Sequence, residues 1–172
     1  GLDLLRIDDV LYTHLDRDHA SFTWSKLRAC RARRWIHRRH VNRAQRDGHA
    51  FRKLDVFDQA FEPIPDVSIE TALSAHDQLG VAVFRIDVAS ASGAASLGFA
   101  TDVGKLEQDW LSLVSGVDIL AVESNYCPAL QVASPRPEMR KRRIMGGAGH
   151  LSNAESAEAG RVGHAPINNS VV

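Results

Sequence analysis

The sequence lacks the features that mark membrane-spanning, secreted and disulfide-stabilised proteins. Its only two cysteines, Cys30 and Cys127, are too far apart for a CxxC motif or a disulfide framework. No apolar run approaches the roughly 18 to 20 residues that cross a bilayer, and the N-terminus has no basic region followed by an apolar core. We therefore expect a cytoplasmic protein that does not associate with membranes.

An excess of charge is also absent, because 21 Lys and Arg side chains balance 21 Asp and Glu side chains. Net charge therefore gives no reason to expect a nucleic-acid partner. Eleven of the cations nevertheless lie between Lys26 and Lys53, where Asp47 is the only acid. Either these arginines and Trp35 guide a nucleic-acid backbone, or they form the exposed face of a helix. The same segment holds three histidines that we expect at the surface: His37, His40 and His49.

The 172 residues, 44% of them hydrophobic, are enough for one domain, which we place at residues 1–159 with a flexible tail at 160–172. Strand formers occupy residues 7–12, 67–74, 81–88, 96–100 and 117–122. Helical patterns cover residues 20–39, 106–114, 135–143 and a start at 153. Residues 40–66 have a poor pattern and are expected as loop or irregular strand. The alternation of strands and helices predicts an α/β domain.

Four residues with metal-ligating side chains follow the first predicted strand within one short string: His14, Asp16, Asp18 and His19. Positions 14 and 16 point the same way from an extended segment, so they can share one ion. Asp18 and His19 lie past the bend and can turn toward a second ion. Taken alone, the string is equally compatible with a solvated loop.

Three further residues of the same type follow other predicted elements. His76 and Asp102 each come directly after a predicted strand, and His150 lies in a glycine-rich turn before a helix start. Loops that leave neighbouring strands converge at one edge of a sheet. We therefore expect these residues to join the first cluster.

The string THLDRDH resembles the THxHxDH signature of metallo-β-lactamase fold hydrolases, with Asp16 where that family has histidine. Three later segments resemble the family's remaining ligand segments in the family's order: SAHDQLGVAVFRI, GFATDVG, and VESNYCP followed by RPEMRKRRIMGGAGHLSN. The resemblance covers the chain from Ile7 to about Asn153. SAHD and GHLSN are similar to the branch of cyclic phosphate phosphodiesterases, ribonuclease Z relatives and exonuclease-like proteins. That branch commonly has ESNH, and this chain has Tyr126 in place of the histidine.

The resemblance implies an α/β metallo-β-lactamase fold, a four-layer αββα sandwich that is incomplete at the N-terminus. The family normally opens with a glycine- and serine-rich hairpin and an aspartate-bearing strand, and nothing before Ile7 corresponds to them. A missing first strand would expose a sheet edge and remove an aspartate that supports the metal ligands.

The resemblance also implies two divalent metal ions and assigns ligands to them. His14, Asp16 and His76 would bind the first ion, Asp18, His19 and His150 the second, and Asp102 would bridge the two. Zinc is the first expectation, with manganese or iron as alternatives because Asp16 adds a hard oxygen ligand. A hydroxide between the ions would attack a phosphodiester, with Asp18 and Asp102 as catalytic residues.

The expected activity is therefore that of a metal-dependent phosphodiesterase or nuclease acting on a small phosphodiester or a nucleic acid. Two alternatives remain. The chain is a degenerate or truncated protein of this fold that binds without catalysis, or a thioester or lactam hydrolase, since metal ligands do not select the electrophile. The oligomeric state is open, with a homodimer as one option.

Overall fold

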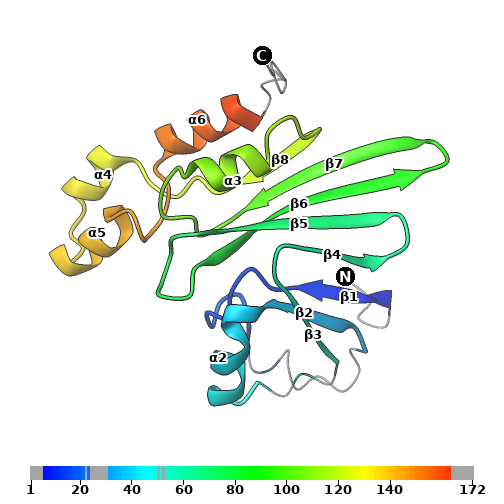
Figure 1. Ribbon diagram of the computed structural model, residues 1–172. Helices are drawn as coiled ribbons and strands as arrows, with labels where there is room; N and C mark the ends of the chain where they lie inside the picture. Colours follow the sequence, from blue (N-terminus) through cyan, green and yellow to red (C-terminus); the bar gives the residue numbers. More distant parts are fainter. Residues whose placement is uncertain (1–5, 22, 24–30, 50, 52, 164–172) are drawn as a thin grey trace.

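The computed structural model describes residues 6–21, 23, 31–49, 51 and 53–163, and shows two β-sheets with helices on their outer faces (Figure 1). The smaller sheet has the order β1-β2-β3 and consists of Asp9–Leu11, Arg33–His37 and Leu54–Phe57, all parallel. The larger has the order β4-β5-β6-β7-β8 and consists of Ala60–Ile64, Val67–Ser74, Val81–Ser90, Gly93–Ala100 and Ile119–Val122. Its pairs are antiparallel except for the parallel pair β7 and β8.

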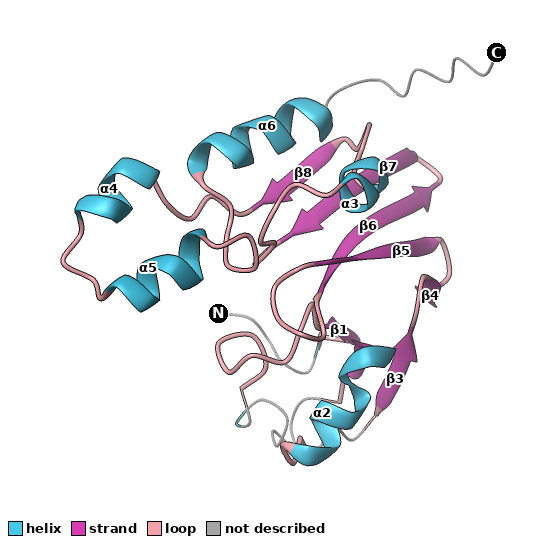
Figure 2. Cartoon of the chain, turned by 60° about the vertical axis from the view of Figure 1, so that its left-hand side comes forward, coloured by secondary structure: helices cyan, strands magenta, loops and turns pink. Residues whose placement is uncertain are grey.

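Six helical segments complete the described part of the chain. They are the 3₁₀ turn η2 (Arg38–His40), α2 (Val41–Arg46), α3 (Gln108–Leu113), α4 (Pro128–Ala133), α5 (Glu138–Met145) and α6 (Asn153–Gly163). Figure 2 shows α3 and α6 over the larger sheet, α2 beside the smaller one, and α4 and α5 as a separate projection. None of these helices is long and apolar enough to cross a bilayer.

Three apolar clusters hold the layers together. One packs α3 and α6 against the larger sheet and contains the fully buried Trp110. A second lies between the two sheets and includes Trp35 and Phe84. A third packs α2 against the smaller sheet through Ile36 and Ala44. The order helix, sheet, sheet, helix is the four-layer αββα sandwich expected from the sequence.

Strand β6 shows why the sequence forms these layers. Its first four residues are all buried, with Val81 and Val83 in the cluster below the helices and Ala82 and Phe84 in the cluster between the sheets. Successive side chains of a strand point to opposite faces, so a continuous apolar run fits a strand that is covered on both sides. Apolar burial at about 25 cal/mol per Å² makes this double coverage a main source of stability.

The structure confirms the strands expected at residues 67–74, 81–88 and 96–100 and the helices expected after residues 106 and 153. The helix predicted for residues 20–39 is wrong over residues 33–37, which form β2 with four buried residues in succession. Residues 24–30 of that prediction lie outside the described part of the chain. The high helix propensity of arginine is overridden where the strand lies in the core.

Three further expectations need correction. Residues 40–66 contain α2, β3 and β4, with Pro63 tolerated because β4 is an edge strand. Residues 160–163 continue α6 and are not a frayed tail, whereas residues 164–172 lie outside the described residues. His37 and His40, expected at the surface, are 4% and 1% exposed, and only His49 of the three is half-buried.

Candidate metal centre

The candidate ligands leave their strands at one end of the larger sheet. Strands β5, β7 and β8 run in the same direction, so the residues that follow them emerge at the same edge. His76 follows β5, Asp102 follows β7 and Glu123 follows β8. The loop after β1 reaches this edge because the amide of Ala82 donates to the carbonyl of Thr13 at 2.9 Å, which joins the two sheets there.

His14, Asp16 and His76 form the first group of possible ligands, with donor atoms that lie within 4.8 Å of one another. Oδ2 of Asp16 lies 3.9 Å from Nε2 of His14 and 3.7 Å from Nε2 of His76. The His14 and His76 rings meet edge to face, with centroids 5.0 Å apart. These are the three residues that the sequence assigned to one ion.

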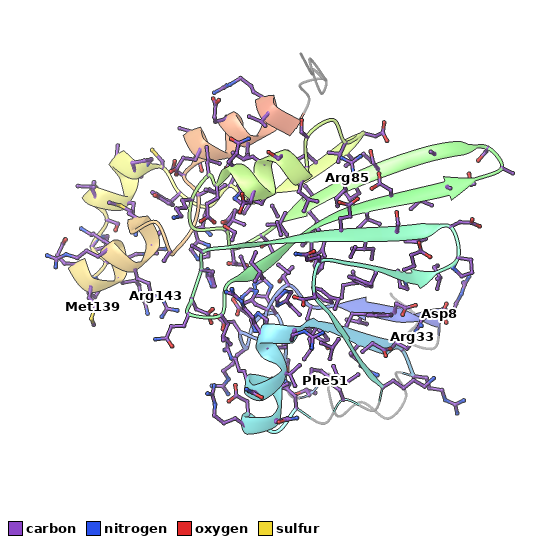
Figure 3. All side chains as sticks on the ribbon, viewed as in Figure 1. Asp8, Arg33, Phe51, Arg85, Met139 and Arg143 are labelled. Atoms are coloured by element: carbon purple, nitrogen blue, oxygen red, sulfur yellow. The ribbon has the colours of Figure 1, made fainter. Side chains whose placement is uncertain are left out.

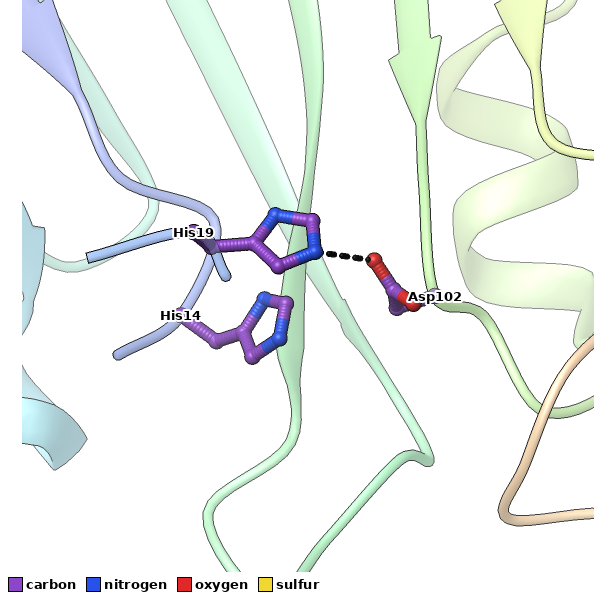
Figure 4. Close-up of side chains that lie close together, drawn as sticks. All are labelled: His14, His19 and Asp102. Carbon is purple, nitrogen blue, oxygen red and sulfur yellow. Dashed lines mark ion pairs between the residues drawn. The ribbon is translucent and has the colours of Figure 1, made fainter. Parts of the chain in front are cut away.

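Asp102 lies between the other two groups. Its Oδ2 is 2.9 Å from Nε2 of His19, the contact drawn in Figure 4, and its Oδ1 is 3.2 Å from Nδ1 of His150. The group His14, His19 and Asp102 thus shares Asp102 with the group Asp102, Glu123 and His150. The Asp102 backbone has φ +55°, a left-handed conformation that is uncommon outside glycine and that concentrates at functional sites.

Glu123 is a site residue that the sequence prediction missed. Its Oε2 accepts from Nδ1 of His150 at 2.9 Å, and its Oε1 accepts from the amide of Leu151 at 3.3 Å. A signal was present, because Glu123 is an acid directly after the buried strand pattern VDILAV, as Asp102 is after β7. Tyr126, at the position where the resembled branch commonly has histidine, lines a different cavity and pairs with Ser152 in an isolated β-bridge.

Hydrogen bonds fix the orientation of the imidazole rings. Nδ1 of His76 donates to the carbonyl of Gly149 at 3.2 Å, which leaves the Nε2 lone pair facing Asp16. Nδ1 of His14 lies 3.0 Å from the Thr13 hydroxyl, and burial together with His19 and His76 lowers the pKa of His14 to about 4. His14 is therefore a neutral imidazole at pH 7. Rings held in this way are typical of metal-binding histidines.

Asp18 is the one predicted ligand that no close group of described donors includes. Its side chain is 82% exposed, and one carboxylate oxygen lies 3.9 Å from Nε2 of His19. It lines the cavity at the site, together with five of the other predicted residues: His14, Asp16, His76, Asp102 and His150. The cavity has a volume of about 420 Å³.

Arg43 holds Asp16, the residue at which the chain departs from the THxHxDH signature. One of its terminal nitrogens lies 2.6 Å from Oδ1 of Asp16, and the other lies 3.1 Å from Asp77. Burial alone would raise the pKa of the Asp16 carboxyl, but the hydrogen bond from Arg43 lowers it. Arg43 thus compensates the extra negative charge of Asp16 and leaves Oδ2 directed at His14 and His76.

A glycine allows the site loops to approach one another closely. A Cβ atom at Gly104 would lie 2.6 Å from the Cα of Ala148 and 2.7 Å from the carbonyl oxygen of Ala75. Only glycine fits between these backbones. The loop that carries His76, the loop after Asp102 and the turn before His150 therefore pack directly on one another.

No family model and no curated protein matches the chain, whereas solved structures do. The chain is similar to zinc-bound PqqB from Methylobacterium extorquens (TM-score 0.58, 16% identity), covering 95% of this chain and 55% of that one. It is also similar to a diphosphatase of the PhnP family (TM-score 0.59, 15% identity), covering 90% of this chain and 55% of that one. A third match is YhfI from Bacillus subtilis, a metallo-β-lactamase fold protein (TM-score 0.62, 13% identity), covering 92% of this chain and 61% of that one.

These similarities show that the chain has the metallo-β-lactamase fold, as the resemblance implied. The chain spans 55 to 61% of the length of these three proteins, which agrees with a fold that is incomplete relative to theirs. The fold and the clustered histidines and carboxylates together define a protein of this fold with a candidate metal centre.

Proposed function

We propose that the chain is a metal-dependent hydrolase of phosphodiesters. The observation that carries the proposal is the overlap of the three donor groups: His14 belongs to two of them, and Asp102 belongs to two. Overlapping groups suit two adjacent cations that share a bridging carboxylate. We assign His14, Asp16 and His76 to the first ion, His19 and His150 to the second, and Asp102 to the bridge.

The donor atoms fit such ions. Imidazole nitrogens and carboxylate oxygens bind zinc, and the carboxylates also suit manganese or iron. Divalent ions held there would lower the pKa of a water molecule and offset the charge that builds on the substrate. Glu123 keeps His150 oriented by accepting a hydrogen bond from its Nδ1, and this hydrogen bond raises the pKa of His150.

Asp18 has a different role in the proposal. Among the described carboxylates that line the cavity, it alone lies outside the close donor groups. Its largely exposed side chain lines the cavity, where the carboxylate would accept a proton from the attacking water and donate it to the leaving oxygen. We therefore assign Asp18 to proton transfer, with ligation of the second ion as its alternative.

Three observations favour a phosphodiester over a thioester or lactam. The segments SAHD and GHLSN resemble the phosphodiesterase branch of the fold, and one of the similar solved structures is a diphosphatase. The cavity is also lined by arginines, whose planar guanidinium groups match phosphate oxygens.

The test combines elemental analysis of the purified chain with hydrolysis of bis(p-nitrophenyl) phosphate when zinc, manganese or iron is supplied. We expect about two ions per chain together with turnover. Asp102→Asn should lose both, whereas Asp109→Asn, an exposed site on α3, should keep both. Absence of metal and of turnover would contradict the proposal in favour of a degenerate protein. Turnover of thioesters or lactams alone would contradict it as well.

A further inference from the structure

Three arginines line the cavity of the candidate metal centre: Arg136, Arg140 and Arg143. The last two belong to α5, and Arg136 lies two residues before that helix begins. Residues spaced three and four apart lie on one face of a helix, so Arg140 and Arg143 face the same cavity. Figure 3 labels Arg143 on α5, at the end of the molecule that also carries α4.

These arginines have no carboxylate partner among the described residues. Arg136 donates to the side-chain oxygen of Gln131 at 3.1 Å, which leaves its charge uncompensated. The acid of the same helix, Glu138, pairs with Lys141 at 3.1 Å. In the described part of the chain, no ion pair includes Arg140 or Arg143. Unpaired guanidinium groups around a cavity are suited to an anionic ligand.

The end of α5 is attached to the metal centre, so the arginines have a defined position relative to it. The amide of His150 donates to the carbonyl of Ile144 at 3.1 Å. A Cβ atom at Gly149 would overlap the carbonyl oxygens of Arg143 and Ile144, so only glycine lets the chain pass here. The carbonyl of Gly149 also accepts from His76, which links α5 to a second candidate ligand.

We propose that Arg136, Arg140 and Arg143 bind a second phosphate of the substrate, a phosphomonoester beside the phosphodiester that is cleaved. This inference rests on the proposed function, because it places the cleaved phosphodiester at the metal ligands of the same cavity. Guanidinium groups bind phosphate oxygens through paired N–H donors, which gives orientation as well as affinity.

The local charge favours a small molecule with a terminal phosphate over a nucleic-acid strand. A phosphomonoester carries a charge of about −1.5 to −2 at pH 7, and three cations in one cavity match it better than the single charge of a backbone diester. Four arginines of the basic segment at residues 31–53 are not available to extend this surface into a strand-binding groove. Carboxylates of the chain itself pair with these four: Arg33, Arg38, Arg43 and Arg46.

Three chromogenic probes with the same scissile bond test the proposal. The first is the p-nitrophenyl ester of thymidine 5′-phosphate, the second adds a free 3′-phosphate, and the third adds a 3′-phosphate capped as its methyl diester. The measurement is the kcat/KM of each probe relative to the first. The variants are Arg140→Gln and Arg143→Gln, and Arg142→Gln on the same helix is the matched control because it does not line the cavity.

We expect the free 3′-phosphate to raise kcat/KM of the unmodified protein, and Arg140→Gln or Arg143→Gln to lower that ratio about tenfold to a hundredfold. Arg142→Gln should leave the ratio unchanged. No preference for the phosphorylated probe, or an equal fall in Arg142→Gln, would overturn the proposal. An equal preference for the methyl diester would also overturn it, in favour of a nucleic-acid strand.

Binding measurements separate the failure of this proposal from the failure of the proposed function. If no probe is hydrolysed with any metal, the proposed function fails. Calorimetry with thymidine 3′,5′-bisphosphate still measures whether the arginines bind a phosphate. Tighter binding of the bisphosphate than of thymidine 5′-phosphate, lost in Arg140→Gln but kept in Arg142→Gln, supports the arginine site. Equal binding of the two nucleotides overturns it.

Discussion

Two basic segments of the chain, residues 31–53 and residues 136–143, look alike in sequence and differ in what surrounds them. In the first, Arg33 pairs with Asp9 at 2.9 Å and Arg43 pairs with Asp16 at 2.6 Å. In the second, Arg140 and Arg143 line the cavity without an acid partner among the described residues. Apart from Asp47, the acids that pair with arginines of the first segment lie elsewhere in the chain: Asp9, Asp16, Asp58 and Asp77. Local composition therefore shows the charge and hides the partner.

Trp35, the tryptophan of the first segment, offers no exposed aromatic surface to a nucleic acid. Trp35 is 9% exposed and stacks on Phe61 with centroids 4.7 Å apart, between the two sheets. Its indole nitrogen donates to Asp9 at 2.8 Å. Trp35 therefore contributes to the core and cannot stack on a base. Arg33 and Arg43 in this segment pair with acids of the fold, and Arg43 positions Asp16, whereas Arg140 and Arg143 of α5 have no acid partner among the described residues.

The largest effect should come from removing the central arginine of the first segment. Arg43→Ala leaves Asp16 and Asp77 without their partner, and Arg43 is only 18% exposed, so we expect a loss of about 2 to 3 kcal/mol in the free energy of unfolding. Urea unfolding followed by circular dichroism measures it.

The matched control for this change is Arg46→Ala in the same helix. Arg46 is 74% exposed, and its one ion pair within the described residues is with Asp47, so the change should stay within about 0.5 kcal/mol. Equal losses in the two variants would remove the distinction between a structural arginine and an ordinary surface arginine.

The sequence predicted much of the candidate site because ligand-type residues follow strands. His14, Asp16, His76, Asp102 and His150 all line one cavity, as the order of strands and loops suggested. Asp18 lines the same cavity but lies outside the close donor groups, since the position of a residue past a bend depends on the turn and not on strand alternation. Its role, like that of the other ligands, stays a prediction.

Contacts between distant segments set the limit of that prediction. Arg43 lies 27 residues from Asp16 in the chain, and no local pattern links the two. Residues 33–37 read as helix because arginine favours helices, yet burial on both faces makes them a strand. The apolar pattern was sufficient for β5, β6 and β7, where neighbouring strands follow one another in sequence.

An acid that is held by backbone and hydroxyl groups should give an intermediate effect. Glu107 accepts from the hydroxyl of Ser74 at 2.9 Å and from the amide of Ala75 at 3.0 Å, just before His76. Burial alone would raise the pKa of Glu107, but these hydrogen bonds and Lys105 lower it. We expect Glu107→Gln to cost about 1 to 2 kcal/mol at pH 7.

The pH dependence of that cost has a defined sign. A carboxyl whose pKa is lowered by folding stabilises the protein above its unfolded pKa of about 4.3, and the contribution disappears as the pH falls through the folded value. The difference between Glu107→Gln and the unmodified protein should therefore shrink between pH 5 and pH 3 in urea unfolding. Asp109→Asn, an exposed acid of the adjacent helix, is the control. A constant difference across this range would exclude the ionised carboxylate as the cause.

The smallest effect on stability is expected where the effect on substrate is expected to be largest. The double change Arg140→Gln and Arg143→Gln removes two like charges that have no acid partner in the described part of the chain. Unfolding should become harder by at most about 0.5 kcal/mol at low salt, and the difference should vanish near 1 M salt, where the Debye length is about 3 Å. A loss above about 1 kcal/mol would mean that these arginines hold α5 in place, as Arg43 holds Asp16. A ligand-binding cluster predicts unchanged or slightly higher stability of the double variant together with weaker binding of a bisphosphate. A structural cluster predicts that stability and bisphosphate binding both fall.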